Sequence, residues 1–196
     1  MISMHNIKNH LSTISELAHD LLMPVLVSAS AAVDATAGNG LDTLFMARIL
    51  PPEASLYAFD IQKSAIEKTA ALLQKHQLLD RVVLLQQGHE EMDSMITGPL
   101  DAVIFNLGYL PNGDHAIVTN AETTIKALQA AMNKLVAGGR IAVTVYPGHP
   151  EGYKEKETLE NWLADFRQID FKVLQLKLIN AAEDSPFIIL IEKTVR

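Results

Sequence analysis

Short apolar runs alternate with segments of helical spacing along most of the chain, and this alternation limits the fold more than any other feature. Five such runs predict buried strands, at about 31–33, 56–59, 82–85, 101–105 and 141–145. The segments after them predict helices, at about 41–50, 63–76, just after Gly88, 119–136 and 155–166. The pair Gly138-Gly139 is expected to end the fourth of these helices. Such alternation predicts a parallel sheet with helices on both faces.

The C-terminal part breaks this alternation, because two strands follow each other there without a helix. They are predicted over about 172–179 and 187–192, and the turn at 180–186 should join them as an antiparallel hairpin. The predicted fold class is therefore α/β: a Rossmann-like, mostly parallel sheet of seven strands with a C-terminal antiparallel hairpin strand and helices on both faces.

Length and composition favour one ordinary globular domain. The chain has 196 residues, of which 48% are hydrophobic and 20% charged, and this balance argues against disorder. Without an internal repeat or a linker, residues 1–196 are predicted to form a single domain, with residues 1–25 as an N-terminal helical segment. The chain contains no cysteine, which excludes disulfides and cysteine-ligated metals.

The same numbers disfavour several classes of partner. No stretch reaches the roughly 18 apolar residues of a membrane span, and the first residues lack the pattern of a signal peptide. We therefore expect a cytoplasmic protein that does not contact a membrane. A net charge of −7 and a pI near 5.4 weaken any broad affinity for nucleic acid but allow a local basic rim. No metal is predicted, because His115 and His149 lack a nearby carboxylate ligand pattern.

The stretch VDATAGNGLDTLFMA, residues 33–47, joins the first predicted strand to the first following helix through small residues. Ligands of parallel α/β sheets bind beyond the carboxyl ends of the strands, and glycines let a ligand approach the backbone there. Asp60 ends the second strand about 20 residues after Gly40, where a carboxylate can accept both hydroxyls of a ribose. The pattern predicts a nucleoside-binding turn.

Two nucleoside cofactors use such a turn. A nicotinamide dinucleotide requires G-x-G-x-x-G, whereas the segment 38–43, GNGLDT, lacks the third glycine and places Asp42 in the first helical turn. A carboxylate there repels a pyrophosphate but suits S-adenosylmethionine, which carries an ammonium and a sulfonium and no phosphate. S-adenosylmethionine is therefore the favoured cofactor. A turn whose glycines only permit packing is the plain alternative.

The segment Gln87-Gly88-His89-Glu90 follows the third strand, where the residues are expected to flank an adenine ring. For His89 a loop with a helix N-cap is an equally good interpretation. The histidines His5, His10, His19 and His76 are interpreted as surface or packing residues.

The segment NLGYLPNGDH, residues 106–115, follows the fourth strand and should face a donated methyl group. Methyl transfer is an in-line displacement, so an enzyme mainly has to orient the attacking lone pair. The Asn106 amide oxygen can accept N–H bonds from an amine, and Tyr109 can stack on a planar base. The segment is similar to the N/D-P-P-Y loop of amine methyltransferases, with Leu107-Gly108 in place of the prolines. In the alternative, Asn106 caps the loop and Tyr109 packs.

The segment YPGHPEGYKEKE, residues 146–157, follows the fifth strand. His149 could accept the proton that an amine loses, since its ordinary pKa lies near working pH. Tyr146 could stack or form a hydrogen bond. Lys154 and Lys156 could touch phosphates at the rim, or belong to a solvated helix.

The motifs VDATAGNGLDTLFMA, NLGYLPNGD and YPGHPEG together resemble the YtqB-like (MnmM) family of bacterial methyltransferases, once labelled rRNA methylases. The resemblance covers nearly the whole chain. It implies a class I methyltransferase fold, S-adenosylmethionine as donor and a homodimer. It also implies a substrate, tRNA, whose wobble base 5-aminomethyl-(2-thio)uridine is methylated to the 5-methylaminomethyl form.

The resemblance also implies a set of site residues. The predicted donor site comprises Asp34, Thr36, Gly38, Asn39, Gly40, Asp42, Thr43, Asp60, Gln62 and His89. The predicted catalytic residues are Asn106, Tyr109 and His149, and the substrate-binding residues are Tyr109, His115, Tyr146 and His149. Two positions depart from the family pattern: Leu41 stands where a histidine is common, and Thr36 where methyltransferases generally have glycine.

Other functions stay open at this point. The same fold could methylate rRNA, or an amine or hydroxyl of a small molecule, and the acidic balance favours a small molecule. A nicotinamide-binding oxidoreductase or a silent nucleotide-binding module is a further alternative, against which Asp42 and the missing glycine argue.

Overall fold

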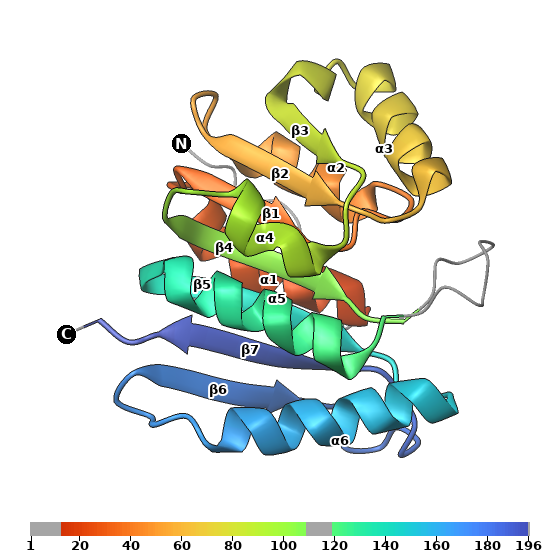
Figure 1. Ribbon diagram of the computed structural model, residues 1–196, viewed down its shortest axis with the longest axis vertical. Helices are drawn as coiled ribbons and strands as arrows, with labels where there is room; N and C mark the ends of the chain where they lie inside the picture. Colours follow the sequence, from red (N-terminus) through yellow and green to blue (C-terminus); the bar gives the residue numbers. More distant parts are fainter. Residues whose placement is uncertain (1–12, 109–118, 196) are drawn as a thin grey trace.

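A seven-stranded sheet forms the centre of the molecule, with strand order β3-β2-β1-β4-β5-β7-β6 (Figure 1). The computed structural model describes residues 13–108 and 119–195. The strands are β1 (Ala31–Asp34), β2 (Ser55–Phe59), β3 (Val82–Leu85), β4 (Leu100–Asn106), β5 (Leu135–Val145), β6 (Phe171–Leu176) and β7 (Phe187–Lys193). Strands β1 to β5 pair in parallel, whereas β7 pairs antiparallel with both β5 and β6. The predicted fold class is confirmed.

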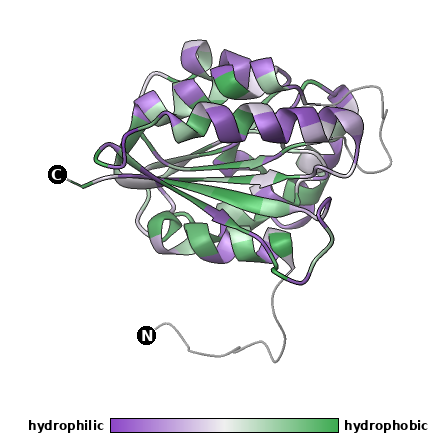
Figure 2. Ribbon diagram, turned by 90° about the horizontal axis from the view of Figure 1, so that it is seen from below, coloured by the Kyte–Doolittle hydropathy of each residue, from purple (hydrophilic) through white to green (hydrophobic). Residues whose placement is uncertain are grey.

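Helices cover both faces of this sheet (Figure 2). They are α1 (Ile14–Leu26), α2 (Leu41–Ile49), α3 (Lys63–Lys75), α4 (Met92–Met95), α5 (Ala121–Lys134) and α6 (Pro150–Ala164), with short 3-10 helices η1 (Leu79–Arg81) and η2 (His89–Glu91). Helices α1, α2 and α3 pack on one face, and α4, α5 and α6 on the other. Ala32 and Val33 are neighbours in β1 but belong to opposite cores, because side chains alternate along a strand. Within residues 13–108 and 119–195, no helix has the length and apolarity to cross a membrane.

The N-terminal helix starts at a capping box. The Thr13 N–H donates to Glu16 Oε2 at 2.9 Å, and the Glu16 N–H donates to Thr13 Oγ1 at 3.3 Å. The helix continues past Pro24 to Leu26, one residue beyond the helical segment predicted over residues 1–25. Leu22 and Leu26 are both fully buried in the same core. Their packing against the sheet outweighs the hydrogen bond that proline removes.

The prediction that Gly138-Gly139 ends a helix is wrong. Helix α5 ends at Lys134, and β5 begins at once with Leu135 and contains both glycines. Gly138 has φ +80°, and a Cβ on Gly139 would lie 2.9 Å from the Asp101 carbonyl oxygen. The register between β4 and β5 shifts next to these residues. The glycines therefore allow an irregular close approach of two strands.

The strand order reverses beside β1, and this reversal locates the place where a ligand can bind. β1 pairs with β2 on one side and with β4 on the other. The connections that follow β1 and β4 consequently diverge, and a crevice opens beyond the carboxyl ends of these strands.

Candidate active site

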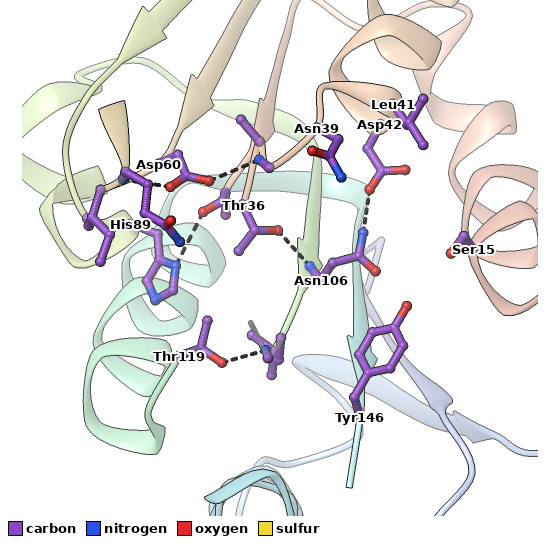
Figure 3. A pocket seen from close by; sticks show the side chains of 18 of the residues that line it. Ser15, Thr36, Asn39, Leu41, Asp42, Asp60, His89, Asn106, Thr119 and Tyr146 are labelled. Carbon is purple, nitrogen blue, oxygen red and sulfur yellow. Dashed lines mark hydrogen bonds between the residues drawn. The ribbon is translucent and has the colours of Figure 1, made fainter. Parts of the chain in front are cut away.

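A cavity of about 590 Å³ lies at this crevice (Figure 3). Its described lining comes from the turn after β1, the residues after β2 and β3, the end of β4, Tyr146 after β5, the N-terminal end of α5, and helix α1. The volume is in the range of pockets for nucleoside-sized ligands. Most of the predicted donor-site residues line it, namely Thr36, Gly38, Asn39, Asp42, Asp60, Gln62 and His89. Asn106 and Tyr146 line it as well.

The turn after β1 is held by backbone hydrogen bonds. The Ala37 N–H donates to the Phe59 carbonyl at 2.8 Å, and the Gly40 N–H donates to the Ala37 carbonyl at 2.8 Å. Gly40 has φ +81°, and a Cβ there would lie 2.9 Å from the Cα of Thr69 in α3. Glycine is therefore required at position 40 both by the left-handed backbone and by the close packing of α3.

Asp60 links two turns at the floor of the pocket. Its Oδ2 accepts the Gly38 N–H at 2.9 Å, and its Oδ1 accepts the Gln62 N–H at 2.8 Å. Each carboxylate oxygen has about two lone pairs, so both oxygens keep acceptor capacity. The carboxylate can therefore accept the two hydroxyls of a ribose without releasing either turn.

Asp34 lies behind the pocket wall. It is fully buried and accepts hydrogen bonds from the Thr36 N–H at 3.1 Å and the Thr43 hydroxyl at 2.5 Å. Burial, reinforced by the neighbouring Asp42, raises the pKa of Asp34 to about 7. Asp34, Gly40 and Thr43 are not among the lining residues, although all three were predicted to bind the donor. They shape the turn from beneath instead.

His89 lines the pocket with a largely buried ring. The ring is 8% exposed, packs edge-on against Phe105 with centroids 5.7 Å apart, and has Nδ1 3.3 Å from the Ala35 carbonyl oxygen. Burial lowers the pKa of His89, so the ring is neutral. A carbonyl can only accept, so Nδ1 carries the proton and Nε2 is an acceptor. Nε2 has no hydrogen-bond partner within the described residues.

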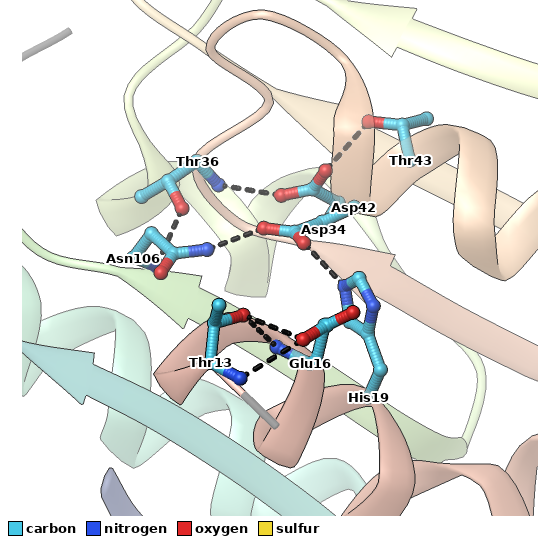
Figure 4. A network of polar contacts seen from close by, with 8 residues as sticks. All are labelled: Thr13, Glu16, His19, Asp34, Thr36, Asp42, Thr43 and Asn106. Atoms are coloured by element: carbon cyan, nitrogen blue, oxygen red, sulfur yellow. Dashed lines mark hydrogen bonds and ion pairs between the residues drawn. The ribbon is translucent and has the colours of Figure 1, made fainter. Parts of the chain in front are cut away.

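Asn106 is fixed at the end of β4 by two neighbours (Figure 4). Its backbone N–H donates to Thr36 Oγ1 at 2.7 Å, and its side-chain Nδ2 donates to Asp42 Oδ2. Thr36 stands where methyltransferases generally have glycine, and its hydroxyl thus has a role, because it holds the end of β4 at Asn106. The Asn106 Oδ1 atom is buried and, in the described part of the chain, has no hydrogen-bond partner. Buried acceptors normally have a hydrogen-bond donor, and a ligand N–H is one group that can fill this role.

Helix α1 contributes residues that the sequence interpretation missed. His19 Nε2 lies 2.5 Å from Asp42 Oδ1, and the His19 ring stacks on Phe45 with centroids 3.9 Å apart. Ser15 also lines the pocket, as does Tyr146, and burial raises the pKa of the Tyr146 hydroxyl. The available signal was a polar face in an otherwise apolar helix, since Ser15 and His19 are spaced i, i+4.

The remaining predicted residues lie elsewhere. His149 is the N-cap of α6, where its Nδ1 accepts the Gly152 N–H at 3.0 Å, and it is not among the lining residues. Lys154 and Lys156 are not lining residues either. Tyr109 and His115 lie outside the described residues. Among the described residues there is no cluster of three or more potential metal ligands, histidine or acidic.

The described lining of the pocket is acidic. Four acidic residues line it, namely Glu16, Asp42, Asp60 and Glu90, whereas the lining that the structure describes includes no lysine or arginine. In addition, the Gly38 and Gly40 N–H groups are already bonded within the protein. The pocket therefore disfavours a pyrophosphate and favours a ligand with positive charge.

Comparison with known proteins agrees with this geometry. The model of a family described as "Putative rRNA methylase" matches residues 56–192. The chain belongs to this rRNA methylase family. The resemblance of its three motifs to YtqB-like methyltransferases is thereby confirmed.

The matches between this rRNA methylase chain and its relatives cover most of its length. It is 35% identical over 176 residues to "tRNA (mnm(5)s(2)U34)-methyltransferase, chloroplastic" of Arabidopsis thaliana, a match covering 85% of this chain and 64% of that protein. A "putative rRNA-methylase" from Clostridium thermocellum has a TM-score of 0.91 and 42% identity, covering 94% of this chain and 99% of that one. "SMU.1697c, a putative methyltransferase" from Streptococcus mutans, solved in complex with SAH, has a TM-score of 0.85 and 37% identity, with the same coverage.

Proposed function

We propose that the protein is an S-adenosylmethionine-dependent N-methyltransferase acting on tRNA. Its substrate is the primary amine of 5-aminomethyl-(2-thio)uridine at the wobble position, and its product is the 5-methylaminomethyl form. The observation that carries the proposal is an acidic pocket in which the buried Asn106 Oδ1 has no partner in the described part of the chain. Such a pocket suits a cationic donor and an amine acceptor.

The part of the pocket lined by Asp60 and His89 fits S-adenosylmethionine. When bound, S-adenosylmethionine supplies an electrophilic methyl group on a sulfonium. Asp60 would accept its ribose hydroxyls, and His89 Nε2 would accept an N–H of the adenine ring. The acidic lining would compensate the positive charges of the ligand, and the ligand carries no phosphate that this lining would repel. The SAH in the Streptococcus mutans relative supports the assignment.

The part of the pocket lined by Asn106 and Tyr146 suits an amine as the methyl acceptor. Asn106 Oδ1 can accept an N–H of the substrate and so direct the nitrogen lone pair along the line of displacement. Tyr146, half-buried beside it, offers an aromatic face for a base (Figure 3). The acidic residues would attract the amine in its ammonium form and leave the backbone phosphates of an RNA outside the pocket. The ammonium would lose one proton to water before the nitrogen lone pair attacks the methyl carbon and S-adenosylhomocysteine leaves. His149 has no part in the proton transfer, because it caps α6.

The choice of tRNA rests on the name of the Arabidopsis thaliana relative. The family description instead mentions rRNA, and a small amine or hydroxyl compound also fits the cavity volume. A homodimer and a cytoplasmic location remain predictions. A nicotinamide dinucleotide is disfavoured by the acidic lining.

The deciding experiment is a methylation assay with defined acceptors. The purified protein and S-adenosylmethionine are incubated with tRNA carrying 5-aminomethyl-2-thiouridine, with rRNA and with small amines, and nucleosides are quantified by mass spectrometry. We expect 5-methylaminomethyl-2-thiouridine only in the tRNA reaction, and loss of that nucleoside from a deletion strain. An unchanged nucleoside profile would reject the tRNA assignment. Thermal stabilisation by NADH and not by S-adenosylhomocysteine would reject the methyl donor as well.

A further inference from the structure

Three residues from separate elements form one hydrogen-bonded chain beside the pocket (Figure 4). His19 of α1 bonds through Nε2 to Asp42 Oδ1, and Asp42 Oδ2 accepts the side-chain Nδ2 of Asn106 at the end of β4. The side chains of His19 and Asp42 are only 18% and 13% exposed. The interaction is thus largely shielded from water, which strengthens it.

This chain of bonds decides which end of the Asn106 amide faces the pocket. A carboxylate only accepts hydrogen bonds, so Asp42 binds the NH₂ end of the amide and leaves Oδ1 for a ligand. If Asp42 turned away, the amide could rotate and present a donor instead of an acceptor. An amine needs the acceptor, because its lone pair is directed at the methyl group while its N–H is held.

His19 is what holds Asp42 in that orientation. Its ring is fixed by parallel stacking on Phe45, with an interplanar angle of 4°, so Nε2 has a defined position. Ser15, one helical turn earlier on the same helix, lines the pocket as well.

We infer that His19 is a positioning residue for the methyl acceptor, acting through Asp42 to keep the Asn106 carbonyl oxygen directed at the amine. This inference rests on the proposed function for its kinetic consequence. The hydrogen-bonded chain itself can be tested without any substrate.

Two substitutions separate the hydrogen bond of His19 from its packing. His19→Phe keeps the ring stacked on Phe45 but removes the N–H, whereas His19→Gln loses the stack and keeps a donor near the position of Nε2. We expect His19→Phe to lower kcat by about 10- to 100-fold while the Kd for S-adenosylhomocysteine changes less than about 3-fold, and His19→Gln to retain most of kcat. Equal kcat losses in both variants, or a Kd that rises as much as kcat falls, would overturn the inference.

A double-mutant cycle tests whether His19 acts through Asn106. If it does, adding His19→Phe to Asn106→Ala should lower kcat less than about 3-fold further, because coupled residues are not additive. Independent, multiplicative losses would contradict the inference.

Nuclear magnetic resonance supplies a measurement that needs no methyl-accepting substrate. The side-chain NH₂ signals of Asn106, identified by their loss in Asn106→Ala, should be shifted by the Asp42 bond. They should move in His19→Phe and Asp42→Asn and stay in place in His19→Gln. Unmoved signals in His19→Phe would refute the positioning role. If the wild-type protein methylates no tRNA but these shifts occur, the proposed function fails and the positioning of Asn106 stands.

Discussion

The carboxylate of Asp60 accepts the backbone N–H of Gly38 at 2.9 Å, although the two residues lie 22 positions apart in the chain. The bond joins the residue after β2 to the turn after β1, and it aligns the carboxylate with the floor of the pocket (Figure 3). One side chain therefore shapes the turn and lines the pocket that opens beside it.

Replacing Asp60 with Ala should weaken binding of S-adenosylhomocysteine by about 10- to 100-fold, since hydrogen bonds to a charged group contribute about 1.5–3 kcal/mol each. Isothermal titration calorimetry measures this directly. Asp80→Ala, at an exposed position in η1, is the matched control and should bind like the wild type. An unchanged affinity in Asp60→Ala would show that the ribose lies elsewhere.

Replacing Asn106 with Ala should lower the rate of methyl transfer far more than donor affinity. The variant removes the buried Oδ1 acceptor but leaves Asp60 and His89 untouched. We expect kcat to fall by roughly 100-fold with little change in the Kd for S-adenosylhomocysteine. A comparable loss in both quantities would mean that Asn106 supports the fold of the pocket and not the acceptor.

Gly40→Ala should destabilise the protein. The new Cβ would meet the Thr69 backbone at 2.9 Å, and a φ of +81° is strained for any residue with a side chain. We expect the free energy of unfolding to fall by about 1–3 kcal/mol, measured by urea denaturation. Gly98→Ala is the control, because a Cβ there meets nothing within 4 Å, and it should change stability by less than about 0.5 kcal/mol.

Asp34 should make folding stability depend on pH. Its pKa of about 7 in the folded protein lies above the value near 3.9 of an unfolded chain. The protonated form is therefore favoured by folding, so its stabilising contribution is complete below pH 4 and is lost as the pH rises through 7. Because Asp34→Asn cannot ionise, the wild type should lose stability relative to this variant by on the order of 4 kcal/mol between pH 4 and pH 8.

Urea denaturation of both proteins across that range measures the difference. Comparing the two curves removes the contribution of groups that both proteins share. Parallel curves would mean that the pKa of Asp34 does not change on folding, and a wild type that gains stability relative to Asp34→Asn at high pH would reverse the assigned direction.

Local sequence was sufficient to predict the sheet, the small-residue turn and the position of Asp60. Strand period, glycine content and the spacing from Gly40 to Asp60 depend on residues that are neighbours in the chain. The end of α5 was the exception. Gly138 and Gly139 resemble a helix stop, but the pairing of β4 with β5 draws them into a strand. That pairing joins residues far apart in sequence.

The roles of single side chains were decided by tertiary structure. Asp34 and Asp42 look equivalent in the sequence, yet Asp34 is buried beneath the turn while Asp42 lines the pocket. His19 appeared to be a packing residue and proves to bond Asp42. The physical reason is that hydrogen bonds between elements depend on how α1, α2 and β4 pack against one another. The composition and hydrophobic periodicity of a single helix or strand do not determine how it packs against the others.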